Sequence, residues 1–217
     1  MRVYFESDNK YEGIRAFPYK GTAGGAEQDY YNFKENPHLI FSVLEDFVPW
    51  QKYEAIKYFY EMLQWLNGDG SPLESSDSAL ANQLRENRTK EAFPRAFEIS
   101  GRLMILFRDL RLNTSAEHMN WLKKAVHFHL LRLDPTFELG AVGLFLTKTS
   151  YTQLGKQLGT ELVILFFAFG DNEQEIMENL NRLFRNLYAA LKNVAQELLE
   201  AQVDNLKTEF PLSADYL

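Results

Sequence analysis

The sequence predicts an α+β domain: a small, mostly antiparallel sheet of about four strands, with helices packed mainly on one face. Three observations predict it. A mostly apolar run of about nine residues, Glu161–Phe169, is rich in β-branched and aromatic side chains and ends at a glycine, which favours a strand. A long apolar pattern with helical spacing follows directly. Along the chain, segments with strand-like and helix-like spacing of apolar residues follow one another in the order β-α-α-β-α-β-β-α, which is typical of an α+β fold.

The strand at Glu161–Phe169 and the helix after it form the unit around which we expect the sheet to be built. Apolar residues occupy both alternating positions of the strand, so both faces should be covered, as in an inner strand. Asp171 predicts the helix N-cap, with Gln174 three residues later as in a capping box. The apolar stripe of the helix comprises Ile176, Leu180, Leu183, Leu187, Leu191, Val194 and Leu198. Free N–H groups at a helix start can bind an anion, but Asp171, Glu173 and Glu175 argue against a phosphate site there.

The N-terminal region combines a short strand with a long irregular segment. Arg2–Phe5 predicts a strand whose terminal position suggests a sheet edge. Residues 8–36 predict an irregular loop, because glycines interrupt any regular period. Within it, Lys20–Gly25 has the residue types of a phosphate-binding loop, but its lysine precedes the glycines. The spacing of a Walker motif is therefore missing.

Two helices and a polar segment follow. Residues 37–48 and 50–66 carry apolar side chains every three or four positions, and Asn67-Gly68 ends the second helix. Residues 69–78 predict a polar loop, and residues 80–90 a weak helical turn. Since this loop is short for a linker between domains, we expect residues 1–217 to form a single globular domain.

The second half of the chain predicts two more strands with a helix between them. Residues 95–112 predict a long strand bent near Gly101, although residues 103–109 also contain helix formers. A helix runs from a capping box at Thr114 to about Arg132. Residues 137–147 alternate as a strand, and a short glycine-containing connection favours antiparallel pairing with the apolar run that follows.

Composition excludes several classes of function. The chain has no cysteine, so disulfides, thiolate catalysis and cysteine-based zinc or iron–sulfur sites are excluded, and a reducing compartment is expected. A net charge of −7 argues against general nucleic-acid binding, which draws on lysine and arginine. No stretch approaches about 20 apolar residues, and the N-terminus lacks the apolar run of a signal peptide. We therefore expect a bacterial-type cytoplasmic protein that contacts neither nucleic acid nor membrane.

The sequence contains no convincing catalytic, metal or cofactor motif. His127 and His129 could chelate a metal from a strand, but on the predicted helix they point about 200° apart. Glu74–Ser78 collects hydroxyls and carboxylates, yet no base, oxyanion hole or nucleophile elbow accompanies them. We therefore assign no catalytic residue, no metal ligand and no cofactor.

An arginine-rich stretch is the candidate ligand site. If Arg102 and Arg108 project from one face of the sheet, they could hold a carboxylate or phosphate by bidentate contacts. Joined to the polar loop, the candidate set comprises Arg102, Arg108, Arg111, Ser75, Ser76 and Asp77. This interpretation requires a pocket where the two segments meet, containing residues with shifted pKa values. The alternative is a solvated face whose arginines pair with acids from elsewhere.

Three functional hypotheses remain at this stage. The first is a non-catalytic protein-interaction module, antitoxin- or immunity-like in role, whose partner is a basic protein attracted by the acidic chain. The alternative is an enzyme or small anionic-ligand binder that uses the arginine-rich strand and the Glu74–Ser78 loop. The third is a homodimer formed through the long C-terminal helix. Size and acidity, together with the missing motifs, favour the first hypothesis.

Overall fold

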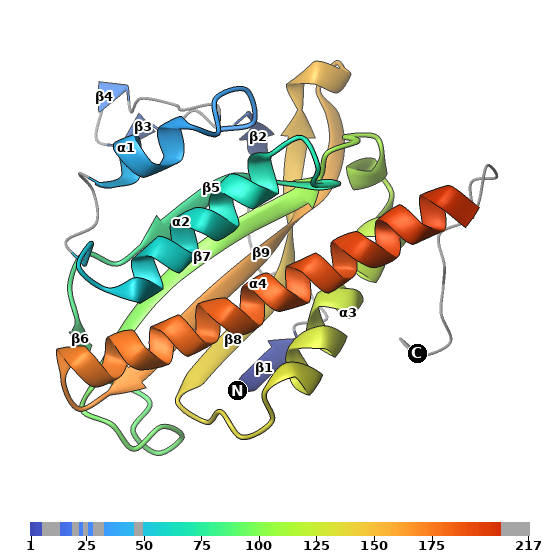
Figure 1. Cartoon of the computed structure of the whole chain (residues 1–217). Coiled ribbons are helices and arrows are strands. Elements are labelled where there is room, and N and C mark those ends of the chain that lie inside the picture. The colour runs from blue at the N-terminus through green and yellow to red at the C-terminus, as the bar shows by residue number, and fades with distance from the viewer. Residues whose placement is uncertain (6–13, 19–21, 24–25, 28–32, 46–49, 205–217) are drawn as a thin grey trace.

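The fold is α+β, as the sequence predicts, with a larger sheet than expected. A computed structural model describes residues 1–5, 14–18, 22–23, 26–27, 33–45 and 50–204. In this part of the chain, four helices accompany a mixed, mostly antiparallel sheet of seven strands, five of which form its main path (Figure 1). None of the described helices combines the length and apolar character that crossing a membrane would require.

The sheet has two composite edges. Its main path runs through β1 (Arg2–Phe5), β8 (Gly140–Tyr151), β9 (Gln157–Gly170), β7 (Phe97–Phe107) and β5 (Leu73–Leu80). Farther along β8, β2 (Arg15–Phe17) continues the β1 edge, and β6 (Arg85–Glu86) continues the β5 edge along β7. Both N-terminal strands pair parallel with β8, whereas the other pairs are antiparallel. A separate pair is formed by β3 (Thr22–Ala23) and β4 (Ala26–Glu27).

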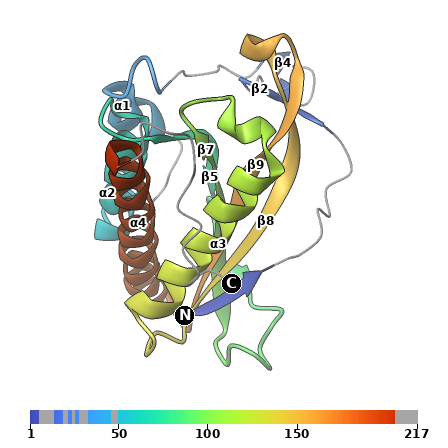
Figure 2. The ribbon, with the colours of Figure 1, turned by 90° about the vertical axis from the view of Figure 1, so that its right-hand side faces the viewer.

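The helices form one layer on one face of the sheet, as predicted. They are α1 (Leu39–Glu45), α2 (Glu54–Asn67), α3 (Ala116–Leu133) and α4 (Glu173–Asp204). Helix α4 crosses the sheet diagonally and packs against α2 on one side and α3 on the other (Figure 1). Seen from the side, the helices stand on one side of the strands (Figure 2).

Strand β9 confirms the predicted inner strand, because it pairs with β8 and β7 and is apolar on both faces. Its residue Phe166 faces the helices, with its ring centroid 6.1 Å from that of Phe59 and 5.1 Å from that of Phe184. Its neighbours in sequence point to the opposite face, where Val163 packs with Met104. We call this opposite face, which the four helices leave uncovered, the open face.

The predicted polar loop at residues 69–78 is wrong at its second half, since Leu73–Leu80 is strand β5. Leu73 enters the helix-side core, while Ser75 hydrogen-bonds Asn67 of α2. Polar composition suggested a loop, but cross-strand pairing and tertiary partners decide whether such a segment extends as a strand. The segment predicted as a weak helical turn, residues 80–90, contains β6 instead.

Strand β7 settles the competing interpretations of residues 103–109, because Leu103–Phe107 is extended, pairs with β5 along its length and pairs with β9 as far as Ile105. Gly101 marks a close approach, as the sequence suggested. A Cβ atom added there would lie 2.3 Å from the carbonyl oxygen of Ala79 and 2.4 Å from the Phe166 ring. Any side chain at this position would therefore force β5 or the helix-side core to move.

The helix starts lie close to the predicted positions. Ser115, rather than Thr114, caps α3 by accepting a hydrogen bond from the His118 N–H group. At α4 the predicted cap, Asp171, is wrong: Asn172 directly precedes the helix, and its Oδ1 accepts from the Glu175 N–H group at 3.0 Å. The segment predicted as an irregular loop, residues 8–36, lies partly outside the described residues, and its described part contains strands β2, β3 and β4.

Candidate functional site

Three of the predicted site residues, Ser76, Asp77 and Arg102, come together on the open face of the sheet. They do so because β5 and β7 are antiparallel neighbours. The register shifts between Ser75 and Asp77, which is a β-bulge. A bulge lets successive side chains reach the same face, so both Ser76 and Asp77 contact open-face groups.

Asp77 holds two guanidinium groups. Its Oδ2 atom accepts hydrogen bonds from Arg102 Nε at 3.0 Å and from Arg15 Nη2 at 3.0 Å. The Asp77 side chain is only 13% exposed. Since charge-assisted hydrogen bonds of this kind are strong, Arg102 is committed to Asp77 rather than to an external anion.

The sheet curls toward its open face around these residues. Arg15 lies on β2, which pairs with β8 near one edge, yet it reaches Asp77 on β5 at the other edge. Phe17 of β2 likewise shares one apolar cluster with Leu106 of β7. Strong right-handed twist in long antiparallel strands produces such curling. The polar side chains are therefore enclosed between β2 and the strands of the main path.

Glu161 completes the group and was missed in the sequence. It is 3% exposed, and it accepts hydrogen bonds from the Ser76 hydroxyl and from Thr149 Oγ1, the latter at 2.8 Å. Burial raises the pKa of the Glu161 carboxyl, and the two hydroxyl donors oppose that shift. The available signal was a single carboxylate opening the apolar run of β9. We name Arg15, Ser76, Asp77, Arg102, Thr149 and Glu161 the open-face cluster.

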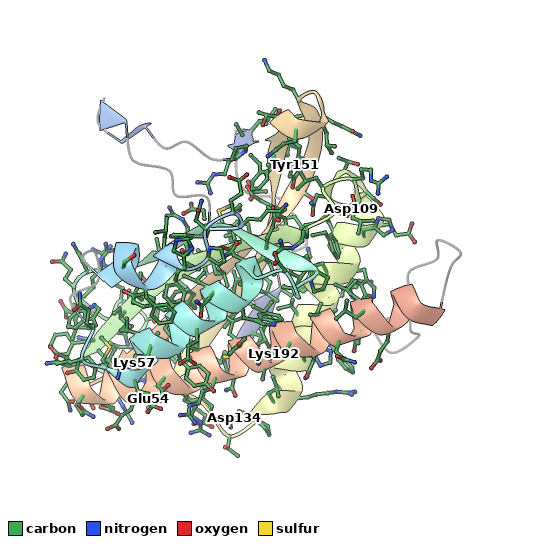
Figure 3. The ribbon with its side chains drawn as sticks, turned by 45° about the horizontal axis from the view of Figure 1, so that its top comes forward. Glu54, Lys57, Asp109, Asp134, Tyr151 and Lys192 are labelled. Atoms are coloured by element: carbon green, nitrogen blue, oxygen red, sulfur yellow. The ribbon has the colours of Figure 1, made fainter. Side chains whose placement is uncertain are left out.

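Further buried polar groups surround the open-face cluster. Glu74 pairs with Lys34 Nζ at 2.7 Å, and burial raises the pKa of its carboxyl. Tyr151 donates a hydrogen bond to the carbonyl oxygen of Thr160 at 2.6 Å (Figure 3). Burial, together with the charges of Glu161 and Glu74, raises the pKa of Tyr151. The acids and bases of this region thus satisfy one another.

The other predicted site residues lie elsewhere. Arg108 donates to the carbonyl oxygens of Ser71, Leu66 and Gly68, and so caps the C-terminal end of α2. Arg111 is solvent-exposed, and its Nη2 lies 2.7 Å from Asp109 Oδ2. Ser75 points to the helix side, where Asn67 Nδ2 donates to its hydroxyl at 2.8 Å.

The two histidines lie on helix α3, as predicted, and contact different groups. The His127 ring lies 5.1 Å from the Phe5 ring, between centroids, and burial lowers its pKa. His129 Nε2 lies 2.9 Å from Glu197 Oε1 on α4. The two rings therefore have separate environments.

A second feature is the outer edge of β1. One side of this strand pairs with β8, and no described strand pairs with the other side. Tyr4 is 49% exposed and Phe5 39% exposed, whereas Val3 packs partly against the helix-side core. The predicted edge position of Arg2–Phe5 is confirmed.

Helix α3 runs beside β1 and adds apolar surface to this edge (Figure 2). The Phe5 ring contacts His127 and lies 4.4 Å from Lys123 Nζ. One turn beyond His127, Leu131 is 49% exposed. We name Val3, Tyr4, Phe5, His127 and Leu131 the β1–α3 edge.

Comparison with known proteins yields no relative. No family model matches the chain, and neither a curated protein nor a solved structure matches it significantly. The open-face cluster and the β1–α3 edge are therefore the features from which function is inferred.

Proposed function

We propose that this chain is a non-catalytic interaction module that binds an extended segment of another protein along the outer edge of β1. The observation that carries the proposal is the unpaired outer side of β1 in the described structure. Unpaired N–H and C=O groups on an edge strand are a template for an added strand. An antitoxin- or immunity-type protein of a bacterial cytoplasm, which acts by binding one partner, is an instance of this class.

Exposed apolar side chains support this location. Among the described residues, the exposed large hydrophobic side chains include Tyr4, Phe5, Leu131 and Leu133, all on β1 or the end of α3. Aromatic residues are enriched at the buried centres of protein interfaces. An added strand would place its own side chains against these groups and remove them from water.

Local charge suggests the character of the docking segment. Arg2 and Arg132 are exposed beside the edge, and Lys124 is half-buried on α3. Positive charge at the rim favours a segment that is apolar with acidic flanking residues. The basic partner expected from the net charge of −7 stays a prediction about the partner as a whole.

The alternative function, an enzyme or anionic-ligand binder at Arg102 with Ser76 and Asp77, has less support. Asp77 already neutralises Arg102, and Arg108 binds the end of α2. The open-face cluster instead has the character of a polar brace that links β2, β5, β7, β8 and β9. A brace of this kind fixes strand register more than it adds net stability.

Site-specific photo-crosslinking tests the proposal. A photoreactive phenylalanine analogue replaces Tyr4 in one variant and Leu158 in a matched control. Leu158 is 58% exposed and also lies on a strand, β9, away from the β1 edge. We expect position 4 to crosslink one partner in stoichiometric amounts from the native host cell, and position 158 to give none.

Two further results bear on the same experiment. Tyr4→Glu should abolish the complex, while Leu158→Glu should leave it intact, because a charge on an edge strand opposes strand addition. A crosslink between two copies of this chain would instead identify a β1-mediated homodimer. Equal crosslinking at both positions, or none at position 4, would refute the edge as the docking site.

A further inference from the structure

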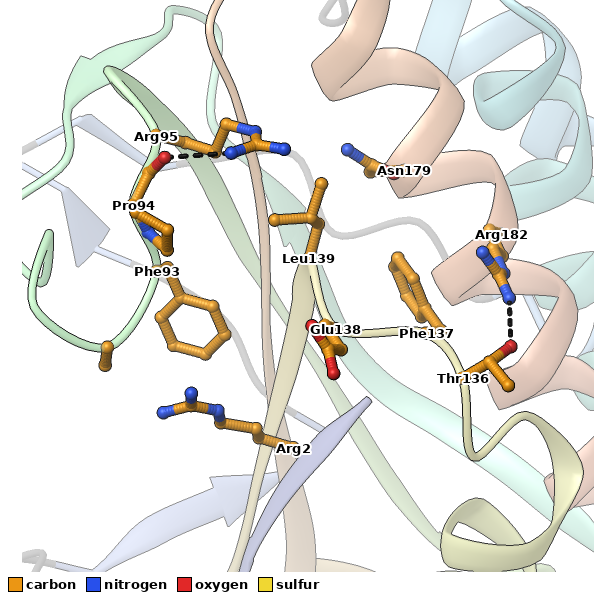
Figure 4. Close-up of a pocket in the computed structure, with 11 residues that line it drawn as sticks. Arg2, Phe93, Pro94, Arg95, Thr136, Phe137, Glu138, Leu139, Asn179 and Arg182 are labelled. Carbon is orange, nitrogen blue, oxygen red and sulfur yellow. Dashed lines mark hydrogen bonds between the residues drawn. The ribbon is translucent and has the colours of Figure 1, made fainter.

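We infer that a pocket at one end of the sheet binds a small zwitterion, a free α-amino acid with an apolar side chain. The pocket has a volume of about 380 Å³ and lies between the loop before β7, the segment leading into β8, and α4 (Figure 4). Its size falls near the lower end of the range of roughly 300–1,000 Å³ for small-molecule sites. It is separate from the open-face cluster, with which it shares no lining residue.

Three guanidinium groups line the pocket, and two of them already have acidic partners. Arg95 Nε lies 2.9 Å from Glu175 Oε1. Arg182 Nη2 lies 2.7 Å from Asp134 Oδ1, and this guanidinium lowers the pKa of Asp134 to about 2. These pairs hold the walls of the pocket in place but contribute little free charge.

Arg2 is the guanidinium that remains available. Within the described chain it forms no ion pair, and its side chain is anchored by the ring of Phe93, whose centroid lies 4.7 Å from the guanidinium carbon. An arginine with its plane supported on an aromatic ring keeps its N–H donors free for a carboxylate. Arg2 would therefore hold the carboxylate of the ligand.

Glu138 supplies the opposite charge. It lines the same pocket, its side chain is exposed, and no ion pair involves it in the described residues. Figure 4 labels Glu138 on the segment between Phe137 and Leu139, among the other residues that line the pocket. An unpaired carboxylate would accept hydrogen bonds from an ammonium group and would repel a doubly charged anion such as phosphate. Together, Arg2 and Glu138 match the two charges of an α-amino acid.

Apolar groups form the rest of the wall. Pro94, Phe137 and Leu139 line the pocket, and Phe137 is almost fully buried. Phe93 is fixed by stacking on Phe169, with centroids 4.0 Å apart and planes inclined by 8°. These rigid apolar surfaces favour an aliphatic or aromatic side chain over a polar one.

Calorimetric titration of the whole chain with free amino acids tests the inference. The probes are L-leucine, L-methionine and L-phenylalanine, with leucinamide and N-acetyl-leucine as analogues that lack the carboxylate and the ammonium charge respectively. We expect at least one amino acid to bind, and both analogues of leucine to bind about tenfold more weakly than leucine.

Charge variants identify the groups that read each end of the ligand. Arg2→Gln should weaken leucine binding about tenfold and leave leucinamide binding unchanged. Glu138→Gln should also weaken leucine binding about tenfold, but should leave N-acetyl-leucine binding unchanged. Arg88→Gln and Glu91→Gln remove matched exposed charges outside the pocket and should have no effect. Arg2→Lys, which keeps the charge, should retain most of the binding.

The outcomes separate cleanly. No binding of any probe up to about 10 mM, or binding that neither Arg2→Gln nor Glu138→Gln weakens, overturns the inference. Circular dichroism of each variant excludes unfolding as the cause of a loss. Tyr4→Glu, which tests the β1–α3 edge, should leave amino-acid binding intact, so failure of one proposal does not imply failure of the other.

Discussion

The two faces of the sheet are built on opposite principles. The helix face is covered by α2, α3 and α4 and packs into one large apolar cluster that includes Phe166, Phe184 and Leu180. The open face carries smaller apolar clusters together with the buried Glu161 and the half-buried Asp77. Adjacent residues of the same strand therefore experience different environments.

This difference separates stability from specificity. Apolar burial contributes roughly 25 cal/mol per Å² and accepts many similar arrangements. Buried ion pairs contribute little net stability, because desolvation offsets their attraction, but they are satisfied in only one arrangement. We expect the helix face to supply most of the free energy of folding, and the open-face cluster to select the register of β2 and β5.

The largest expected effect is on the helix face. Phe166→Ala should lower the free energy of unfolding by about 3–5 kcal/mol, because a fully buried ring is lost and a cavity remains. The matched control is Phe167→Ala, one residue along the same strand. Phe167 is half-buried on the open face, so its replacement should lower the free energy of unfolding by less. Urea denaturation followed by circular dichroism measures both. Equal losses would contradict the proposed division between the faces.

A smaller loss is expected when the open-face cluster is broken. Asp77→Ala should reduce the free energy of unfolding by about 1–3 kcal/mol, since Arg15 and Arg102 lose their shared acceptor. Both arginines remain partly exposed, so water replaces part of the interaction. A double-mutant cycle with Arg102→Met measures the coupling by urea denaturation. Additive losses would show that Asp77 and Arg102 do not act together.

The pH dependence of stability should change when Glu161 is made neutral. Burial raises the folded-state pKa of Glu161 above its unfolded value, so the folded state holds this proton more tightly. The associated stability is present below the unfolded pKa, about 4.3, and is lost as pH rises through the folded pKa. Glu161→Gln should therefore remove part of the decline in stability above about pH 4.3.

Melting temperatures across this pH range test the Glu161 prediction. The control is Glu86→Gln. Lys90 lowers the pKa of the exposed Glu86 carboxyl, so neutralising Glu86 cannot remove a decline in stability that comes from a raised pKa. If the melting temperatures of Glu161→Gln and of the unaltered protein change with pH in parallel, the raised pKa of Glu161 is contradicted.

The smallest effect is expected at a surface ion pair. Arg111→Gln removes a partner of Asp109, but the Arg111 side chain is 81% exposed. Exposed pairs contribute little because water and salt screen them. We expect no measurable change in the melting temperature. A clear decrease would show that the arginine has a structural role that its exposure does not indicate.

The sequence was most informative where apolar residues followed a single clear spacing, either strand-like or helical. The β9 strand and helix α4 were predicted from apolar runs and stripes, and the antiparallel pairing of β8 with β9 from their short connection. Strand β5 was missed because its polar residues satisfy partners far away in sequence, such as Glu161 for Ser76. Local pattern carries no information about such pairs.

The candidate site shows the same limit. Their role as a ligand site stays a prediction, but Ser76, Asp77 and Arg102 were grouped in the sequence and do lie together, because the strands that carry them are neighbours. Arg15 and Glu161 were not, since curling of the sheet brings them in from β2 and β9. Arg108 was placed with Arg102 by residue type alone, and its position beyond the end of β7 directs it to the carbonyl groups of α2.

The parallel pairing of β1 with β8 has a consequence for synthesis on the ribosome. Arg2 pairs with Ala141, so β1 leaves the ribosome on the order of ten seconds before its partner strand is made. During that interval Val3, Tyr4 and Phe5 have no sheet to join. A chaperone that shields β1 until the β8–β9 hairpin emerges would therefore raise the yield of folded protein.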